Sequence, residues 1–323
     1  MNAPVDLRAI QAAFDRKYEQ LEIRFDPEYA VAWSYMKPIG APCFNVGLLK
    51  DLRAHDQALE INGGYVPFDG ELRQVHYHVL ASKIEGIFNL GGDLALFMSW
   101  IKSHDRPALF DYAKLCIDDI SARINNYNVP ITTISLVQGD ALGGGFETAL
   151  SSNVVIAERG AKMGLPEILF NLFPGMGAYS LLGRRLGMKR AEEMILSGRI
   201  YQAAELHEME LVDVLAEDGE GERAVWDFIK SNDKKRNGMQ AVFRARRQFS
   251  PISYEELINI ANIWVDAAMR LEERDLKLMN RLMRSQLKRV NAVEQTEEVR
   301  PQVKRIRDEA YVEPLHVGQF AFA

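Results

Sequence analysis

Three consecutive glycines, Gly143 to Gly145, stand between a predicted strand over 131–139 and a helix that opens with Phe146 and Glu147. Each glycine loses more backbone freedom on folding than any other residue, so a triplet is costly in an ordered segment. The first N–H groups of a helix have no intrahelical acceptor, and the helix dipole makes that end positive. The triplet therefore predicts a place where bare backbone meets a negatively charged atom.

A second glycine loop and a second carboxylate accompany the triplet. Gly91 and Gly92 precede Asp93 at another strand-to-helix transition, and Glu167 follows Glu147 by 20 residues. Neither loop has the lysine of a P-loop or the spacing of a dinucleotide fingerprint. Two N–H groups that meet at one oxygen form an oxyanion hole, where each donor can contribute about 3 kcal/mol to a transition state. Taken singly, each loop is more often a tight turn and each glutamate a solvated charge, but together they favour chemistry on a thioester enolate.

Strands and helices alternate along the first two thirds of the chain, which predicts an α/β architecture. In chain order the expected elements are a helix over 6–20, a hairpin over 20–36, a helix over 43–59, a strand over 75–82, helices over 95–103 and 107–126, and strands over 131–139 and 154–158.

The predicted secondary structure changes after residue 215, beyond which nearly every segment is expected to be helical. An acidic, glycine-bearing segment over 216–224 predicts a boundary between a core over 1–215 and a helical region over 216–323. Within the second region, Ser253 and Glu256 have the spacing of a capping box, and apolar residues follow at steps of three and four.

Composition and net charge argue against several classes of protein. Hydrophobic residues make up 47% and charged residues 26%, as in ordinary globular proteins. The net charge of −6 argues against general nucleic-acid binding. No apolar run approaches a membrane span, and the N-terminus has no signal-peptide core, so a cytoplasmic protein is expected. Cys43 and Cys116 are far apart and fit a reducing compartment.

Histidines and basic residues carry weaker signals. His76 and His78 alternate on a predicted strand, with His104 well separated and no carboxylate at metal-ligand spacing, so neither a metal nor a cofactor is expected. A basic stretch is typical of a solvated helix face, although it could also meet an acidic carrier protein or its pantetheine phosphate. It comprises Lys234, Lys235, Arg236, Arg244, Arg246 and Arg247.

Four motifs resemble the crotonase, or enoyl-CoA hydratase, superfamily: FNLGGDL (88–94), QGDALGGGFE (138–147), GLPEILFNLFPGMG (164–177) and the run over 191–215. The resemblance covers residues 20–290. It implies a spiral of ββα turns followed by a helical region that covers an acyl pocket and supports a homo-oligomer, either a trimer or a hexamer. It also implies that Gly92 and Gly144 supply the oxyanion-hole N–H groups and that Glu147 and Glu167 are the acid/base carboxylates.

Further segments are similar to the diffusible signal factor synthases, a crotonase branch: APCFNVGLLKDL (41–52), YHVLAS (77–82) and FNLFPGMGAYS (170–180). That similarity implies dehydration of a 3-hydroxyacyl chain on acyl carrier protein to the cis-2-enoyl thioester, and then hydrolysis to the free acid. Met176, Trp264 and Leu282 are expected to line an apolar slot, with core or subunit interface as the alternative.

Two other functions fit the same motifs. A catabolic enoyl-CoA hydratase would use the same glutamates on trans-2-enoyl-CoA, and a protein that binds a signalling partner would have its site occluded. The motifs leave open the acyl chain length, cis or trans geometry, the carrier (acyl carrier protein or CoA) and which glutamate is the acid.

Overall fold

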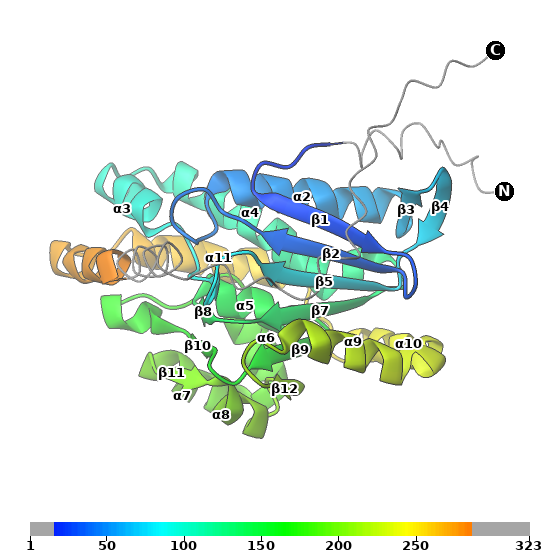
Figure 1. Ribbon diagram of the computed structural model, residues 1–323. Helices are drawn as coiled ribbons and strands as arrows, with labels where there is room; N and C mark the ends of the chain where they lie inside the picture. The colour runs from blue at the N-terminus through cyan, green and yellow to red at the C-terminus, as the bar shows by residue number, and fades with distance from the viewer. Residues whose placement is uncertain (1–15, 286–323) are drawn as a thin grey trace, which may run out of the picture.

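The computed structural model describes residues 16–285, and its centre is a six-stranded sheet in the order β1-β2-β5-β7-β9-β12 (Figure 1). The antiparallel hairpin of β1 and β2 is joined to parallel strands throughout the rest of the sheet. β2, β5, β7 and β9 are buried along nearly their whole length, as parallel strands covered on both faces must be. The strands are β1 (Leu21–Asp26), β2 (Val31–Met36), β5 (Tyr77–Ser82), β7 (Thr132–Val137), β9 (Val154–Glu158) and β12 (Val214–Ala216).

A smaller sheet, in the order β11-β10-β8-β6, runs beside the first. Three successive strands of the main sheet, β5, β7 and β9, are each followed by a strand of the small sheet and then by helix. This repeat is the predicted spiral of ββα turns, which is confirmed. The short strands are β6 (Ile87–Asn89), β8 (Asp140–Leu142), β10 (Lys162–Gly164) and β11 (Ile200–Gln202).

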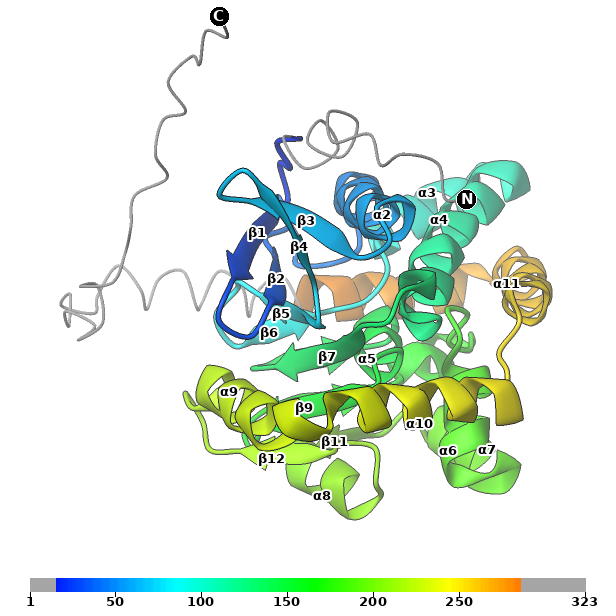
Figure 2. The same cartoon turned by 90° about the vertical axis from the view of Figure 1, so that its right-hand side faces the viewer.

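Helices cover both faces of the main sheet (Figure 2). α2 (Val46–Ile61) and α4 (Arg106–Ile124) pack on one face, while α9 (Gly221–Asn232) and α10 (Arg236–Phe249) pack on the other. The short α5 (Gly144–Leu150) lies in the core. The remaining helices are α3 (Leu94–Lys102), α6 (Ala178–Leu186), α7 (Met188–Ser197), α8 (Ala203–Glu208), α11 (Tyr254–Ala268) and the 3-10 turns η1 (Asn126–Asn128), η2 (Pro166–Phe170) and η3 (Asp233–Lys235).

Most expected elements are present with small shifts of their ends. The hairpin over 20–36, the helices over 43–59, 95–103 and 107–126, and the strands over 75–82, 131–139 and 154–158 are confirmed. The helix after the glycine triplet begins earlier than expected, at Gly144, and ends at Leu150. The expected helix over 6–20 is irregular over 16–20, and its other residues lie outside the described part, as do residues 286–323 of the expected C-terminal region. A hairpin of β3 (Tyr65–Phe68) and β4 (Glu71–Gln74) was not predicted.

Only half of the expected capping box forms at the start of α11. The Ser253 side chain accepts a hydrogen bond from the Glu256 N–H, 3.0 Å away. The Glu256 carboxylate instead accepts from Ser180 and Arg184 of α6, which ties α11 to that helix. This anchorage matters because α11 carries Trp264 to the site described below.

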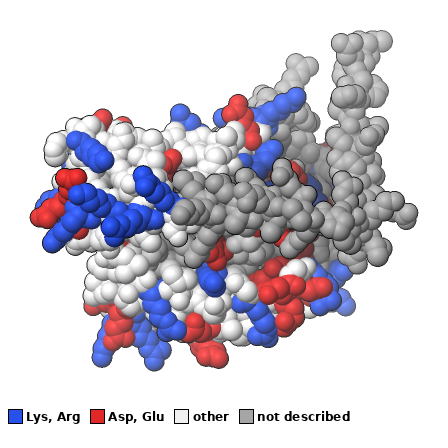
Figure 3. All heavy atoms as spheres, turned by 60° about the vertical axis from the view of Figure 1, so that its left-hand side comes forward, with Lys and Arg blue, Asp and Glu red and all other residues white. Residues whose placement is uncertain are grey.

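Acidic and basic side chains are interspersed on the face that Figure 3 shows, with broad uncharged areas between them. The net negative charge is therefore not spread there as a uniform acidic surface. Within residues 16–285, none of the helices combines the length and the apolar character needed to cross a membrane.

Candidate active site

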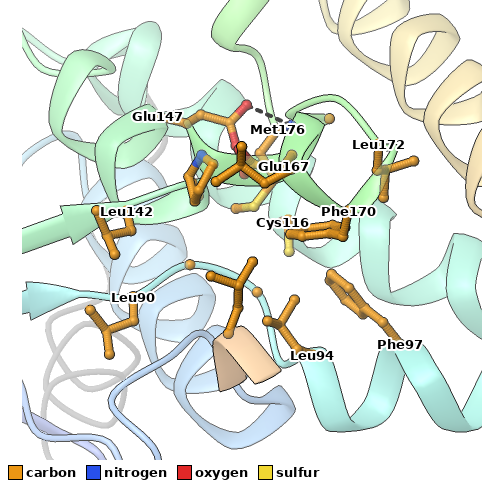
Figure 4. A pocket seen from close by; sticks show the side chains of 18 of the residues that line it. Leu90, Leu94, Phe97, Cys116, Leu142, Glu147, Glu167, Phe170, Leu172 and Met176 are labelled. Atoms are coloured by element: carbon orange, nitrogen blue, oxygen red, sulfur yellow. Dashed lines mark hydrogen bonds between the residues drawn. The ribbon is translucent and has the colours of Figure 1, made fainter. Parts of the chain in front are cut away.

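A cavity of about 370 Å³, here called the main cavity, lies between the two glycine loops and helices α4 and α11. Its volume is at the lower end of the roughly 300–1,000 Å³ that small-molecule sites occupy. Figure 4 shows Glu147 and Glu167 on one side, with Leu90, Leu94 and Phe97 across from them. Every site residue expected from the sequence lines this one cavity: Gly92, Gly144, Glu147, Glu167, Met176, Trp264 and Leu282.

The geometry explains the glycine triplet residue by residue. Gly143 has φ +52°, and a Cβ there would lie 2.4 Å from Glu167 Oε1. A Cβ on Gly144 would lie 2.6 Å from Met176 Sδ, and one on Gly145 would lie 2.0 Å from the Asn89 carbonyl oxygen. A side chain at Gly145 would therefore collide with backbone, whereas one at Gly143 or Gly144 would displace the side chain of Glu167 or Met176.

The two glycine loops lie side by side. A Cβ on Gly91 would come within 3.1 Å of the Gly144 nitrogen. The Gly91 N–H donates to Asn89 Oδ1 at 2.8 Å, and the Phe44 N–H donates to the Gly91 carbonyl at 2.8 Å, so the first loop is held on both sides. Gly144 is the first residue of α5, where an N–H has no intrahelical acceptor. The arrangement suits the oxyanion hole predicted from Gly92 and Gly144.

Glu147 is buried and fixed by backbone donors. Its Oε1 accepts hydrogen bonds from the Met176 and Ala178 N–H groups, both at 2.8 Å. Burial raises the pKa of Glu147 to about 7, against the lowering effect of these two donors. Because the donors stabilise the ionised form, Glu147 can carry a negative charge in an apolar cavity.

Glu167 has a different environment on η2. Its Oε2 is buried and has no hydrogen-bond partner in the described part of the chain. Burial, and then repulsion from Glu147, raises the pKa of Glu167 to about 8. Near neutrality the pair therefore holds one proton, with the charge favoured on Glu147 and the proton on Glu167. A carboxylate beside a carboxylic acid is what proton transfer at two neighbouring carbons requires.

The rest of the lining is mainly apolar and aromatic. Trp264 lies edge-on to Phe97, with ring centroids 5.1 Å apart, and a Cβ on Gly175 would lie 2.4 Å from its Cγ. Leu282 comes from a helical segment over 273–285 that follows α11. Burial raises the pKa of the Cys116 thiol well above its usual range. The thiol is therefore neutral, and it contributes an apolar contact to the cavity lining and does not act as a nucleophile.

Several lining residues were not predicted: Phe97, Tyr112, Cys116, Phe170 and Leu172. The first three belong to the apolar segments over 95–101 and 107–116, which form α3 and the start of α4. Their helical spacing is the same as that of core residues, so only the tertiary arrangement shows which of these residues line the cavity and which pack in the core.

The histidines and the basic stretch lie away from this site. His78 is buried between Ser34 and the Tyr127 hydroxyl, at 2.8 Å from each, and burial lowers its pKa well below the usual range. Among residues 16–285, no group of three or more His, Cys, Asp or Glu side chains could hold a metal ion. The basic stretch lies on η3 and α10, across the main sheet, and none of its residues lines the main cavity.

The carboxyl pair predicts a bell-shaped dependence of kcat/KM on pH. On the acidic side both carboxyls are protonated and no base remains, while on the alkaline side both are ionised and no acid remains. The raised pKa values place the limbs near pH 7 and pH 8. Initial rates at subsaturating substrate across this range check the prediction, and a profile that is flat from about pH 5 to 10 would contradict it.

Comparison of the sequence with protein families identifies residues 70–250 as enoyl-CoA hydratase/isomerase. Among curated proteins, human mitochondrial methylglutaconyl-CoA hydratase is 34% identical over 153 residues. That stretch is 47% of this chain and 43% of the human protein, so the chain spans less than half the length of this relative.

Solved structures share the fold. DspI from Pseudomonas aeruginosa superposes with a TM-score of 0.61 at 22% identity, over 73% of this chain and 84% of DspI. An enoyl-CoA hydratase from Bacillus halodurans superposes with a TM-score of 0.69 at 17% identity, over 81% of this chain and 99% of that protein.

Proposed function

The chain belongs to the enoyl-CoA hydratase/isomerase family, and from that premise we propose that it dehydrates a 3-hydroxyacyl thioester on acyl carrier protein to the cis-2-enoyl thioester and hydrolyses it to the free acid. The observation that carries the proposal is the pair of Glu147, which is buried, and Glu167, whose Oε2 is buried and unpaired, beside two glycine loops in one apolar cavity. The similarity of the motifs to diffusible signal factor synthases supports the choice of substrate.

Dehydration needs one base and one acid, which a pair holding a single proton supplies. The ionised carboxylate takes the α-proton, and the electrons pass to the thioester oxygen as an enolate that Gly92 and Gly144 N–H groups stabilise. The enolate then expels the 3-hydroxyl, which leaves as water after it receives the proton of the other carboxyl. The C2–C3 double bond forms, and the pair again holds one proton, now on the opposite carboxyl.

Hydrolysis reuses the same groups on the same carbonyl. The ionised carboxylate takes a proton from a water molecule, and the hydroxide so formed adds to the thioester carbon. The oxyanion of the tetrahedral intermediate occupies the position that the enolate oxygen held before. Collapse breaks the C–S bond, and the protonated carboxyl gives its proton to the departing thiolate. The products are the free acid and the carrier thiol.

Two rival functions use the same structure differently. A catabolic hydratase adds water to a trans-2-enoyl-CoA and releases no free acid. A partner-binding protein has no need of the unpaired, buried Glu167 Oε2, which costs desolvation energy without a compensating bond. The second function is therefore the less favoured.

The test is incubation of the full chain with 3-hydroxydodecanoyl-acyl carrier protein, with products separated against cis and trans standards and identified by mass spectrometry. Free cis-2-dodecenoic acid is the expected product. Enoyl thioester without free acid, together with rapid turnover of crotonyl-CoA, would assign the chain to the hydratases. No turnover of either substrate would favour the partner-binding function.

Leu282→Asn is expected to raise KM for a dodecanoyl-length substrate about tenfold and to leave a butyryl-length substrate unchanged. Leu282 lines the main cavity, and contact with a leucine side chain is worth about 1.5–3 kcal/mol when it is fully buried. The matched control is Leu278→Asn, because Leu278 lies on the same helical segment, is 40% exposed and does not line the cavity. Equal KM values for the two variants would remove Leu282 from the acyl site.

A further inference from the structure

A second cavity, here called the arginine cavity, lies between α6, α10 and the segment that follows α5. Its volume is about 160 Å³, and Arg185, Arg246, Arg247, Ser151 and Asn153 are among its lining residues. Figure 2 shows α10 in front of the sheet with α6 beside its second half. Since α5 has seven residues, the arginine cavity is roughly 10 Å from the glycine end of that helix and forms no part of the main cavity.

The charges around the arginine cavity are not balanced. Arg184 is neutralised by Glu256, with 2.8 Å between nitrogen and oxygen. Among residues 16–285, no carboxylate oxygen comes within 4.0 Å of the guanidinium nitrogens of Arg185, Arg246 or Arg247. Asp213 acts on Arg185 from farther away, but its own Oδ2 accepts the Val155 N–H at 2.7 Å.

The three unpaired guanidinium groups are held in place by neutral contacts. Arg185 Nη2 donates to the carbonyls of Leu150 and Ser152, at 2.9 and 3.2 Å. Arg247 Nη1 donates to Asn126 Oδ1 at 2.8 Å, and the Arg246 guanidinium lies 5.1 Å from the centre of the Phe243 ring. A guanidinium has five N–H donors, so each of these groups keeps several for a ligand.

Burial and neighbouring positive charge both act on the pKa values of Arg185 and Arg247. Burial lowers the pKa of Arg185; Asp213 opposes this effect, and the charge of Arg246 adds a smaller lowering. Burial, Arg246 and Arg244 lower the pKa of Arg247. Bringing an anion among fixed like charges relieves their repulsion and forms charge-assisted hydrogen bonds, for which the planar guanidinium suits phosphate particularly well.

We propose that the arginine cavity binds a small phosphate dianion, either inorganic phosphate or the phosphate of a small monoester. Three positive groups around a cavity of this size favour a dianion over a single carboxylate. The site stands apart from the proposed thioester chemistry, because none of the three arginines lines the main cavity. Its Ser151–Asn153 wall directly follows the helix that begins at Gly144.

The test measures binding to the full chain in phosphate-free chloride buffer at constant ionic strength. Isothermal titration with inorganic phosphate, glycerol phosphate and acetate, together with Tm in each, distinguishes the ligand sources. Saturable binding of phosphate or glycerol phosphate, with a raised Tm and no response to acetate, is expected. The tighter of the two identifies whether the free ion or the monoester is preferred.

Arg246→Gln and Arg247→Gln are each expected to weaken phosphate binding about tenfold or more. The matched control is Arg244→Gln, which removes the same charge from the same helix but not from the cavity lining. Arg185 is left intact because it supports the end of α5. Circular dichroism verifies that all three variants fold.

Three results would overturn the proposal. Wild-type protein that shows no saturable phosphate binding has no such site. An equal loss in Arg244→Gln would mean that the general charge of α10 attracts the ion. Absence of phosphate binding together with a changed sedimentation coefficient in Arg247→Gln would mean that a second copy of the chain fills the cavity. Thioester turnover enters none of these measurements, so the proposed function is tested separately.

Discussion

Turnover of a 3-hydroxyacyl thioester is expected to fall by about 10²–10⁴-fold when either Glu147 or Glu167 is replaced by glutamine. Glutamine has nearly the same shape but neither takes nor gives a proton at neutral pH. In Glu147→Gln the amide oxygen can still accept the Met176 and Ala178 N–H groups, so the loop that holds Met176 should stay in place. Single-turnover rates with mass-spectrometric detection of product provide the measurement.

The matched control for this pair is Glu158→Gln. Glu158 is also buried, at 7% exposure, and its Oε1 accepts the Gly221 N–H at 3.0 Å, but it does not line the main cavity. Its variant should keep wild-type turnover. A Glu147 or Glu167 variant that stays within tenfold of wild type would rule out the two-carboxylate mechanism.

Glu167→Gln should also change stability in a pH-dependent way. The pKa of Glu167 in the folded protein, about 8, lies above its ordinary value of 4.5. The folded chain therefore binds more protons than the unfolded chain between these values, and the free energy of unfolding falls as pH rises through that window. Glutamine removes this loss, so the Tm of the variant should exceed that of wild type at pH 8 and converge with it near pH 4.5. A Tm difference that does not grow with pH would show that Glu167 is not buried as described.

The glycine loops and the two carboxylates could be predicted from the sequence because their signals are local. A triplet such as Gly143 to Gly145 is costly in an ordered segment, and the alternation of strands and helices predicts that it lies at the end of a strand. The ββα spiral followed from the resemblance of the motifs. What no local pattern contains is the contact between Gly143 and Glu167, which exists only because η2 returns to the loop.

The hairpin of β3 and β4 was missed although its signal was present. Asp69 and Gly70 form its turn, with φ values of +50° and +76°, and an Asp-Gly pair is a strong predictor of such a turn. The flanking strands are short and only partly buried, and Pro67 argues against a strand. These features obscured the alternation that usually accompanies the turn.

The lining of the main cavity illustrates a second limit of prediction from sequence. Phe97 and Cys116 are buried like any core residue, at 7% and 0% exposure, and nothing in their spacing distinguishes a residue that faces a cavity from one that faces another side chain. Phe97 and Trp264 can lie this close to the loops because Gly92 and Gly175 carry no side chain: a Cβ on Gly92 would fall 2.4 Å from Phe97, and one on Gly175 would fall 2.4 Å from Trp264. The positions of such lining residues thus depend on glycines in other segments of the chain.

The oxyanion hole can be tested at a single atom, because Gly144 is the first residue of α5. Gly144→Pro removes its N–H, and proline is well accepted at the first position of a helix, where that N–H has no intrahelical acceptor. Gly144→Ala is the matched control, since it keeps the N–H. Both variants place a Cβ about 2.6 Å from Met176 Sδ, which is the end of a flexible side chain that can move in each of them alike.

The difference between the two variants therefore reports the loss of the N–H together with the ring carbon that proline places at the same point. Gly144→Pro is expected to have a kcat about 10²–10³-fold below that of Gly144→Ala, the effect of losing one oxyanion-hole donor. In the proposed mechanism both the enolate and the tetrahedral intermediate place their negative oxygen at this N–H, so dehydration and hydrolysis should slow together. Equal kcat values in two variants with the same Tm would remove Gly144 from the oxyanion hole. A selective loss of hydrolysis would mean that the two steps use different oxygen positions, and hence that the thioester moves between them.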